Sequence, residues 1–458
     1  MAVLLMLLVF VAVLLLVKWY SSPGKMSPYH GKCFPSFLGK ASDFAINPIS
    51  LIHETGVRYE SAFSVQSQMI YNSLLRTMKL NVVDPDISEN APSFCHGMGT
   101  YLNKTVDLEY VNNIRVMIES FPRYMGRTET QEHTVQYVTE ETHSCALEWT
   151  TRSDVELFAG VSELAHHVLV RSLMGDDFYE SGAELLGLVR SMERDAGDFW
   201  CSALPDWAPY PPARRLHRAR ERIREIFWER LGQRHVDAKN GELASDLPDY
   251  ITYMLHDRST APLKHCFASH HTLLMLASDT STAAVISWVL VCLLRHPDVM
   301  AAVKRDARSG SCDSALLQAC IKETMRYYNA MKRFRAAAAS LKHEDSESYP
   351  KFDTWMPGRW LNAENKLVDL EERVKESWCA AFGGGGRRCP GEKMATIIVT
   401  QTLTTLLRCY DIRWVTPDQP RTARFDDLDF DRLGSPWLKS GLRVKVSRRV
   451  WPESMGGC

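Results

Sequence analysis

The chain has 458 residues, of which 45% are hydrophobic and 24% charged, and its formal net charge is -1 at pH 7. This hydrophobic content suffices for a sizeable core, and the balanced charge gives no general attraction to nucleic acid. The length alone would suggest about three domains, but no low-complexity linker divides the chain, so one large globular domain is allowed. The 12 cysteines are scattered without regular spacing, which indicates free thiols rather than a disulfide scaffold.

The N-terminus is an uninterrupted apolar run over residues 1–17, followed by a Lys-Trp-Tyr sequence typical of a membrane interface. A helix of this length spans roughly 26 Å at about 1.5 Å per residue, the short limit for crossing a bilayer. No basic residue precedes the run and no small-residue cleavage site follows it, so we favour a transmembrane anchor over a cleaved signal peptide. Lysines occur only after the run, which places the rest of the chain in the cytosol. A polar hinge at residues 18–35 then leads into a globular domain over residues 36–458.

The next part of the chain that carries a clear pattern is helical. Residues 41–130 support no detailed assignment, whereas apolar residues recur at three- and four-residue steps over residues 132–173 and predict helices. Prolines at residues 205–212 break the chain before the basic run 214–222. Glutamates alternate with these arginines, which is typical of a solvated helix face, so we expect no nucleic-acid binding there.

Residues 271–295 form a long apolar run that ends before Pro297 and predicts a helix. The polar residues 279–282 interrupt it, beginning with Asp279 and Thr280. A buried polar group costs roughly 2–7 kcal/mol unless it is hydrogen-bonded, so this break favours a functional interpretation. The alternative is a Ser/Thr patch that bonds back to the carbonyl four residues earlier, with Asp279 at the surface.

Glu323 and Arg326 lie three residues apart and therefore share one face of a predicted helix. Taken alone they would form an ordinary surface pair worth about 0.3–0.5 kcal/mol. Arg359 follows in the segment 355–360, which reads Trp-Met-Pro-Gly-Arg-Trp.

Cys389 lies inside a glycine run and just before an apolar helix-like segment over residues 393–410. Consecutive glycines let the backbone pass close to a bulky group. The helix N-terminus and the cations Arg387 and Arg388 favour the thiolate form, which can bind a metal. The alternative of an inert buried cysteine is weakened by these surroundings. Short-spaced partners for zinc and the Lys-Ser/Thr of a phosphate loop are absent from the sequence here.

The pattern Phe382-x-x-Gly385-x-Arg387-x-Cys389-x-Gly391 resembles the haem-binding signature of the cytochrome P-450 family, with all its fixed positions present. The resemblance implies a mainly α fold with small β-sheets, in addition to the N-terminal transmembrane helix. It also implies haem b, whose iron is ligated axially by the cysteine thiolate, with the other signature residues around the cofactor. Residues 428–446 resemble the closing strands of that family.

The same resemblance assigns roles to the earlier motifs. Asp279 and Thr280 look like the acid–alcohol pair on the oxygen-binding side of the haem, where a hydroxyl can hold water and pass protons. Glu323, Arg326 and Arg359 match a structural triad in which one buried carboxylate is satisfied by two guanidiniums. The chain resembles fungal-type microsomal members of the family. Its helices over residues 132–176 and the proline-rich break before the basic run loosely resemble the sterol 14α-demethylase branch.

The implied activity is that of an oxidoreductase, a monooxygenase that inserts one oxygen atom of O2 into an apolar substrate. Sterols, terpenoids and polyketides of lipid or secondary metabolism are the expected class. Two alternatives stay open: a haem-binding but degenerate, non-catalytic member, and an enzyme that isomerises or dehydrates a peroxide.

The chain carries no flavin or nicotinamide motif, so we expect electrons from a separate NADPH-cytochrome reductase at the endoplasmic reticulum membrane. The single-pass anchor would leave the catalytic domain cytosolic.

The chain departs from the family between Arg326 and Pro357, where relatives carry roughly twice as many residues, enough for a two-stranded hairpin. The segment 327–356 shows no β-branched alternation. In the family this strand lines the substrate pocket and holds a basic residue near a haem propionate, a role left here to Arg333 or Arg335. Two causes stay open: a mis-joined exon, or a real deletion that opens the pocket to water.

Overall fold

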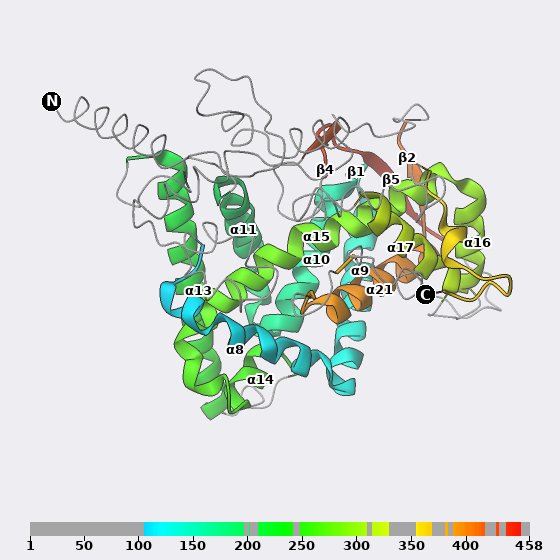
Figure 1. Ribbon diagram of the computed structural model, residues 1–458. Coiled ribbons are helices and arrows are strands. Elements are labelled where there is room, and N and C mark those ends of the chain that lie inside the picture. Colours follow the sequence, from blue (N-terminus) through cyan, green and yellow to red (C-terminus); the bar gives the residue numbers. More distant parts are fainter. Residues whose placement is uncertain are drawn as a thin grey trace, which may run out of the picture.

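The computed structural model describes residues 105–196, 201, 209–240, 248–308, 314–328, 354–368, 381–382, 388–416, 427–429 and 437–449. This part of the chain is mainly helical with two small sheets, which confirms the predicted fold class (Figure 1). The predicted anchor at 1–17 and hinge at 18–35 lie outside the described residues, as do the first part of the domain and residues 329–353, most of the segment predicted to be shortened.

The helices and 3-10 turns follow one another along the chain. They are α8 (Leu108–Met125), α9 (Thr128–Thr151), α10 (Leu157–Met174), η1 (Asp176–Ser181), α11 (Gly182–Ala196), α13 (Pro211–Asn240), α14 (Tyr250–His256), η2 (Ala261–Cys266), α15 (Phe267–Arg295), α16 (Pro297–Arg308), α17 (Ala315–Tyr328), η3 (Pro357–Trp360) and α21 (Glu392–Cys409). The helices predicted over 132–173, 271–295 and 393–410 are therefore present as α9, α10, α15 and α21.

Helix α15 lies at the centre of the described part and packs against α10 and α21 (Figure 1). Ala261–Arg295 is the described helix that is long and apolar enough to span a membrane, yet 78% of its apolar window is buried in the protein. Its neighbours α10, α13 and α21 cover it, so it is a core helix. The helix ends at Arg295 because Pro297 begins α16 and cannot continue the α15 hydrogen-bond ladder.

The sheets are short and antiparallel. In the larger sheet β5 (Arg443–Arg448) pairs with β1 (Val155–Glu156) on one side and β2 (Tyr410–Trp414) on the other. Val444 and Val446 of β5 face the core while Arg443 and Lys445 are exposed, the alternation of a half-buried strand. The smaller sheet joins β3 (Leu428–Asp429) to β4 (Trp437–Leu438). The closing strands predicted over 428–446 are thus β3, β4 and β5.

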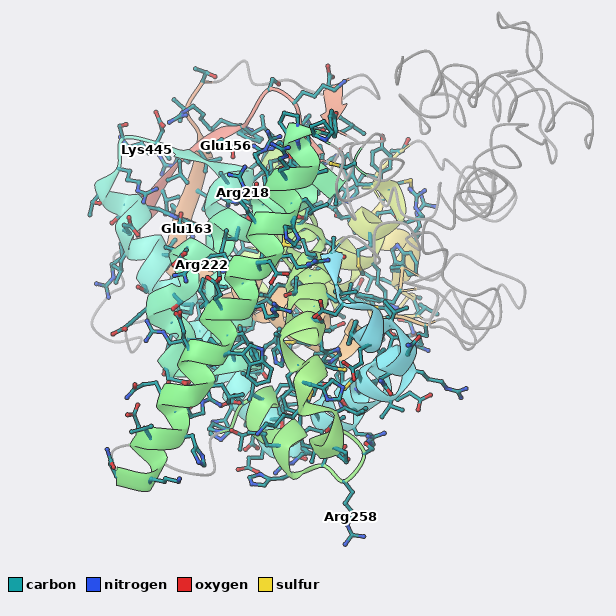
Figure 2. The ribbon with its side chains drawn as sticks, turned by 90° about the vertical axis from the view of Figure 1, so that its left-hand side faces the viewer. Glu156, Glu163, Arg218, Arg222, Arg258 and Lys445 are labelled. Atoms are coloured by element: carbon teal, nitrogen blue, oxygen red, sulfur yellow. The ribbon has the colours of Figure 1, made fainter. Side chains whose placement is uncertain are left out.

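The basic run of the sequence lies on α13. Arg218 and Arg222 lie on its outer face in Figure 2, Arg218 exposed and Arg222 partly exposed. Arg222 pairs with Glu184 of α11 at 2.8 Å and with Glu225 of its own helix at 3.3 Å. The prediction of a solvated face with matched charges is confirmed.

Candidate active site

The cysteine loop closes immediately before α21. The backbone N–H of Cys389 donates to the carbonyl of Phe382 at 2.7 Å, so the first and later positions of the signature lie against each other. Gly391 is the residue at the N-cap of α21, which places the thiol beside the positive end of an 18-residue helix. The predicted position of Cys389 at a helix N-terminus is therefore observed.

Cys389 differs from the other free cysteines that the structure describes because it is exposed. The buried ones are Cys145, Cys201, Cys266, Cys292 and Cys320. Burial raises the pKa of Cys145 and of Cys292 to about 12, which keeps both as inert thiols. Cys409 is disulfide-bonded, so the prediction of free thiols is wrong at that position.

The residues beside the Cys389 sulfur fit the expected haem. A Cβ built on Gly391 would lie 3.8 Å from Cys389 Sγ and 3.9 Å from Cε1 of Phe121 on α8, so a side chain there would cover the sulfur. Glycine leaves this approach open for a flat, bulky group. The donor set, one exposed sulfur at a helix N-terminus, is that of thiolate ligation. Arg388 bonds Glu392 in an exposed ion pair at 2.5 Å.

Thr280 and Asp279 are both buried in the middle of α15. The alternative of back-bonding holds for their serine neighbours, because Ser278 donates to the Leu274 carbonyl at 2.5 Å and Ser281 to the Ala277 carbonyl at 2.7 Å. It does not hold for Thr280, whose hydroxyl donates to a side chain of another helix. The surface position considered for Asp279 is also wrong, since the residue is 2% exposed.

Asp279 faces α10. Its Oδ2 accepts a hydrogen bond from Ser162 Oγ at 3.5 Å, and its Oδ1 lies 4.0 Å from Nδ1 of His166. The Nε2 atom of His166 lies 3.0 Å from the Gly182 carbonyl, which only accepts, so Nε2 carries the hydrogen. Burial lowers the pKa of His166 to about 3, so the ring is neutral and Nδ1 presents a lone pair to the carboxyl group.

Sequence reasoning missed the groups that surround the pair. Arg190 of α11 donates to Ser162 at 3.0 Å and thereby connects the Asp279 network to a partly exposed guanidinium. Glu193 of α11, which is 3% exposed, accepts the Thr280 hydroxyl at 2.8 Å. The hydrogen bonds of Ser162 with Asp279 and of Thr280 with Glu193 join residues more than 80 positions apart. No local pattern in the sequence could have indicated them.

Glu323 brings the predicted triad together at the end of α17. Its carboxylate accepts two hydrogen bonds from Arg326 at 2.9 Å each and lies 3.1 Å from Arg359 Nε. The Met356 N–H and the Trp360 indole also donate to it, both at 2.9 Å. Because Glu323 is fully buried, these donors replace the water that the charge has lost.

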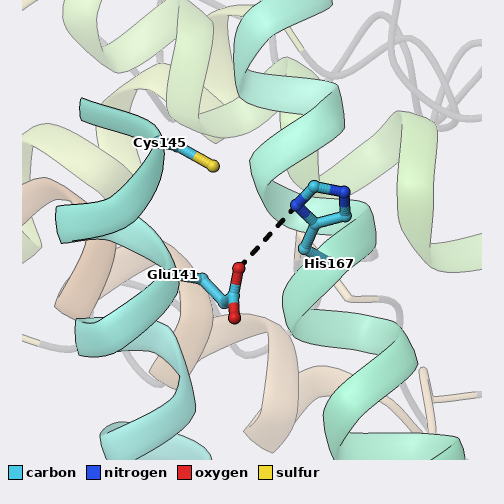
Figure 3. Close-up of side chains that lie close together, drawn as sticks. All are labelled: Glu141, Cys145 and His167. Carbon is cyan, nitrogen blue, oxygen red and sulfur yellow. Dashed lines mark ion pairs between the residues drawn. The ribbon is translucent and has the colours of Figure 1, made fainter. Parts of the chain in front are cut away.

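A second group of possible metal ligands lies between α9 and α10. Glu141, Cys145 and His167 place their ligand atoms within 4.8 Å of one another (Figure 3). However, Arg171 and the Tyr179 hydroxyl each donate at 2.9 Å to a different oxygen of the Glu141 carboxylate. A metal also needs the thiolate of Cys145, whose raised pKa disfavours it. We therefore interpret this group as a buried ion-pair cluster.

The remaining predicted cofactor residues, Gly385, Arg387 and Arg335, lie outside the described residues. The structure thus places Cys389, Phe382 and Gly391 at one loop. It places Asp279 and Thr280 on α15, a helix that packs against α21.

The family profile and the similar sequences point to one family, the cytochromes P450, and the similar solved structure shares the fold. The sequence profile of the Cytochrome P450 family matches residues 115–342 and 336–427. Cytochrome P450 monooxygenase pynD from Aspergillus niger is 36% identical over 442 residues, with 90% of each chain covered. Lanosterol 14-alpha demethylase from Bos taurus is 23% identical over 431 residues, covering 84% of this chain and 82% of the demethylase. The solved structure of retinoic acid bound cyanobacterial CYP120A1 is similar at a TM-score of 0.58 and 16% identity, over 77% of this chain and 83% of that one.

Proposed function

Because this chain belongs to the cytochrome P450 family of haem-thiolate monooxygenases, we propose that it oxidises an apolar sterol, terpenoid or polyketide intermediate of lipid or secondary metabolism. The observation that carries the proposal is the exposed Cys389 thiol at the N-terminus of α21, a helix that packs against α15. The substrate class is supported by the weak similarity to a sterol demethylase.

We assign haem binding to Cys389 as the axial thiolate and to the rest of the signature around it. The supporting residues are Phe382, Gly385, Arg387 and Gly391, with Arg335 as the candidate partner of a propionate. Thiolate-ligated haem supplies the O–O cleavage chemistry of the reaction. The apolar lining that a P450 pocket needs is consistent with α15, most of whose side chains are buried.

Thr280 and Asp279 are proposed to hold and move protons on the oxygen-binding side. The Thr280 hydroxyl can accept a proton on its oxygen and donate its own hydrogen, so it can relay protons without carrying a charge. Asp279 connects through Ser162 to Arg190, which is partly exposed, so a polar network leads from the pair toward solvent; the guanidinium donates hydrogen bonds in this network and keeps its own proton. The intact pair favours oxygen activation over rearrangement of a peroxide, which needs no proton supply.

Electrons are proposed to come from an NADPH-cytochrome reductase on the same membrane. Residues 1–17 would anchor the chain in the endoplasmic reticulum with the catalytic domain in the cytosol. The exposed cations beside the thiol, Arg388 and Lys393, would form part of the docking surface together with Arg387.

The central test is spectroscopic. The purified full-length protein is reduced under carbon monoxide and compared with Cys389→Ser. We expect the strongly red-shifted Soret band of thiolate ligation in the wild type and its loss in the variant. Cys320→Ser is a matched control, because Cys320 is buried in α17 and should leave the band unchanged. A wild type without the shifted band contradicts the proposal.

A further inference from the structure

The Thr280 hydroxyl has a carboxylate partner of its own. Helix α11 packs against α15 and places the Glu193 carboxylate, 3% exposed, so that Oε1 accepts the hydroxyl hydrogen at 2.8 Å. The acid next to Thr280 in the sequence, Asp279, points instead toward Ser162 and His166 of α10. Among the described residues, the direct side-chain partners of Thr280 and Asp279 therefore lie on different helices, with Glu193 on α11 and with Ser162 and His166 on α10.

A hydroxyl group has one hydrogen and two lone pairs, so its partner decides what it can do. While Glu193 is ionised, the single hydrogen of Thr280 points at the carboxylate, and the hydroxyl can only accept from any other group. When Glu193 is protonated, its carboxyl donates to the Thr280 oxygen instead. The hydroxyl hydrogen is then released and can be donated to an acceptor on the haem side of α15.

We infer that Glu193 is a positioning residue that sets the direction in which Thr280 donates, and that it stores the proton that Thr280 delivers during oxygen activation. This inference rests on the proposed function. In one delivery, the Glu193 O–H bond breaks as a new O–H bond forms at Thr280, whose original hydrogen passes to the acceptor. Glu193 is left as a carboxylate and regains its proton from water, so no oxidant or reductant enters the step.

Contacts of the neighbouring polar groups distinguish this arrangement from ordinary helix packing. Ser278 and Ser281 satisfy their hydroxyls within α15, and Thr280 could do the same by bonding to the carbonyl of residue 276. Its hydroxyl instead bonds a buried carboxylate on another helix, although burying a carboxylate is costly. The Trp437 indole of β4 donates to the Thr280 carbonyl at 3.4 Å, which helps to fix the backbone at this point.

The test uses the full-length, haem-loaded protein with Glu193→Gln, which keeps an acceptor for Thr280 but cannot store a proton. We expect product formed per electron to fall on the order of tenfold and hydrogen peroxide to rise. The substrate-induced spin-state shift and its midpoint concentration should remain unchanged. Glu184→Gln is the matched control, because Glu184 lies on the exposed side of α11. Wild-type coupling in Glu193→Gln contradicts the inference.

A second readout does not depend on turnover. The infrared band assigned to the Glu193 carboxyl group by its loss in Glu193→Gln should shift in Thr280→Val, which removes the donor, and stay in place in Ser281→Ala. A band that does not respond to Thr280→Val contradicts the hydrogen bond on which the inference depends.

The results also distinguish a failure of the Glu193 inference from a failure of the proposed function. If Glu193→Gln does not accumulate as folded protein, Glu193→Asp replaces it; the shorter side chain should reduce coupling, and coupling equal to the wild type counts against the inference. If the wild type lacks the red-shifted carbon monoxide band, the proposed function itself fails. If the band is present but coupling is insensitive to Glu193, only the role of Glu193 is lost.

Discussion

Asp279 and Thr280 are adjacent in the sequence, but a helix turns successive side chains by about 100° and so directs them to different neighbours. Asp279 faces α10 and Thr280 faces α11. The sequence predicted that these residues act together, and it also offered a patch of Ser and Thr residues bonding within the helix. Both descriptions apply to part of the segment. Ser278 and Ser281 bond to carbonyls within α15, whereas Asp279 and Thr280 bond to side chains of other helices.

Separate variants of the pair should therefore have related but unequal effects. In Thr280→Val we expect electron consumption to continue while product falls and hydrogen peroxide rises, because the proton supply is lost. In Asp279→Asn the same change should be accompanied by a larger solvent isotope effect, because reloading from water becomes slow. Ser281→Ala, which removes a hydroxyl bonded within the helix, is the control. Equal product yields in all three variants and the wild type would show that the pair is structural.

At the level of single residues, the sequence predicted what a local motif can carry. Cys389 and its signature were identified because fixed spacing around one loop reflects one chemistry. Glu193, Ser162 and His166 were not identified, because their roles arise only when α10 and α11 pack against α15. Side-chain contacts between distant helices depend on the tertiary fold rather than on any short pattern.

Among the elements, α9, α10, α15 and α21 were predicted from their apolar period and α13 from its alternating charges, whereas α8 was not predicted. Residues 271–295 correspond to α15, and the end at Pro297 follows from the missing N–H of proline. Helix α8 lies largely in the part for which we made no assignment, and its Pro122 lies inside the helix where the sequence alone argues against one. The short strands β1 and β2 were also not predicted, since strands of this length are defined mainly by their pairing with β5.

Helix α17 and turn η3 are joined through Glu323, so the triad can be tested as a connection between elements. Glu323→Gln removes the charge that the buried Arg326 and the partly buried Arg359 share, and we expect the free energy of unfolding to fall by about 3–5 kcal/mol. Chemical denaturation followed by circular dichroism measures this change. Glu392→Gln breaks an exposed pair with Arg388 and should cost at most about 1 kcal/mol. Equal losses in the two variants would contradict the role of the triad.

On the scale of the whole molecule, the charges beside the thiol form the candidate contact with a redox partner. Arg388→Glu and Lys393→Glu should slow reduction by the reductase, most strongly at low salt, because steering by exposed charges is screened by ions. Stopped-flow reduction under carbon monoxide measures the rate. Arg218→Glu on the exposed face of α13 is the control for a general effect of charge (Figure 2). A rate in the first two variants that equals the wild type at every salt concentration removes these residues from the docking surface.

Buried histidines should make the protein sensitive to acid. Burial lowers the pKa of His166 to about 3, of His271 to about 4 and of His270 well below its usual value. In the unfolded chain these rings titrate near 6.5, so between about pH 6.5 and 4 the unfolded state binds more protons and the folded state loses stability as the pH falls.

The slope should be about 1.4 kcal/mol per pH unit for each such histidine below pH 6.5. Unfolding free energies measured at a series of pH values give this slope. His166→Gln should reduce it, whereas the same substitution at the exposed His217 should not. A slope that is unchanged in His166→Gln would show that this ring is not buried as a neutral group.

The triad also joins the residues on either side of the segment that we predict to be shortened, because Arg326 and Arg359 bond one carboxylate. The chain between these two arginines therefore begins and ends at Glu323, and the entropy of closing such a loop grows only logarithmically with its length. Halving the number of residues changes that cost by about 0.6 kcal/mol. A real deletion would thus leave the thermal stability of the polypeptide almost unchanged and would instead be detected as weak retention of haem. Restoring a hairpin of family length at this position should raise haem occupancy without raising the unfolding temperature of the apoprotein.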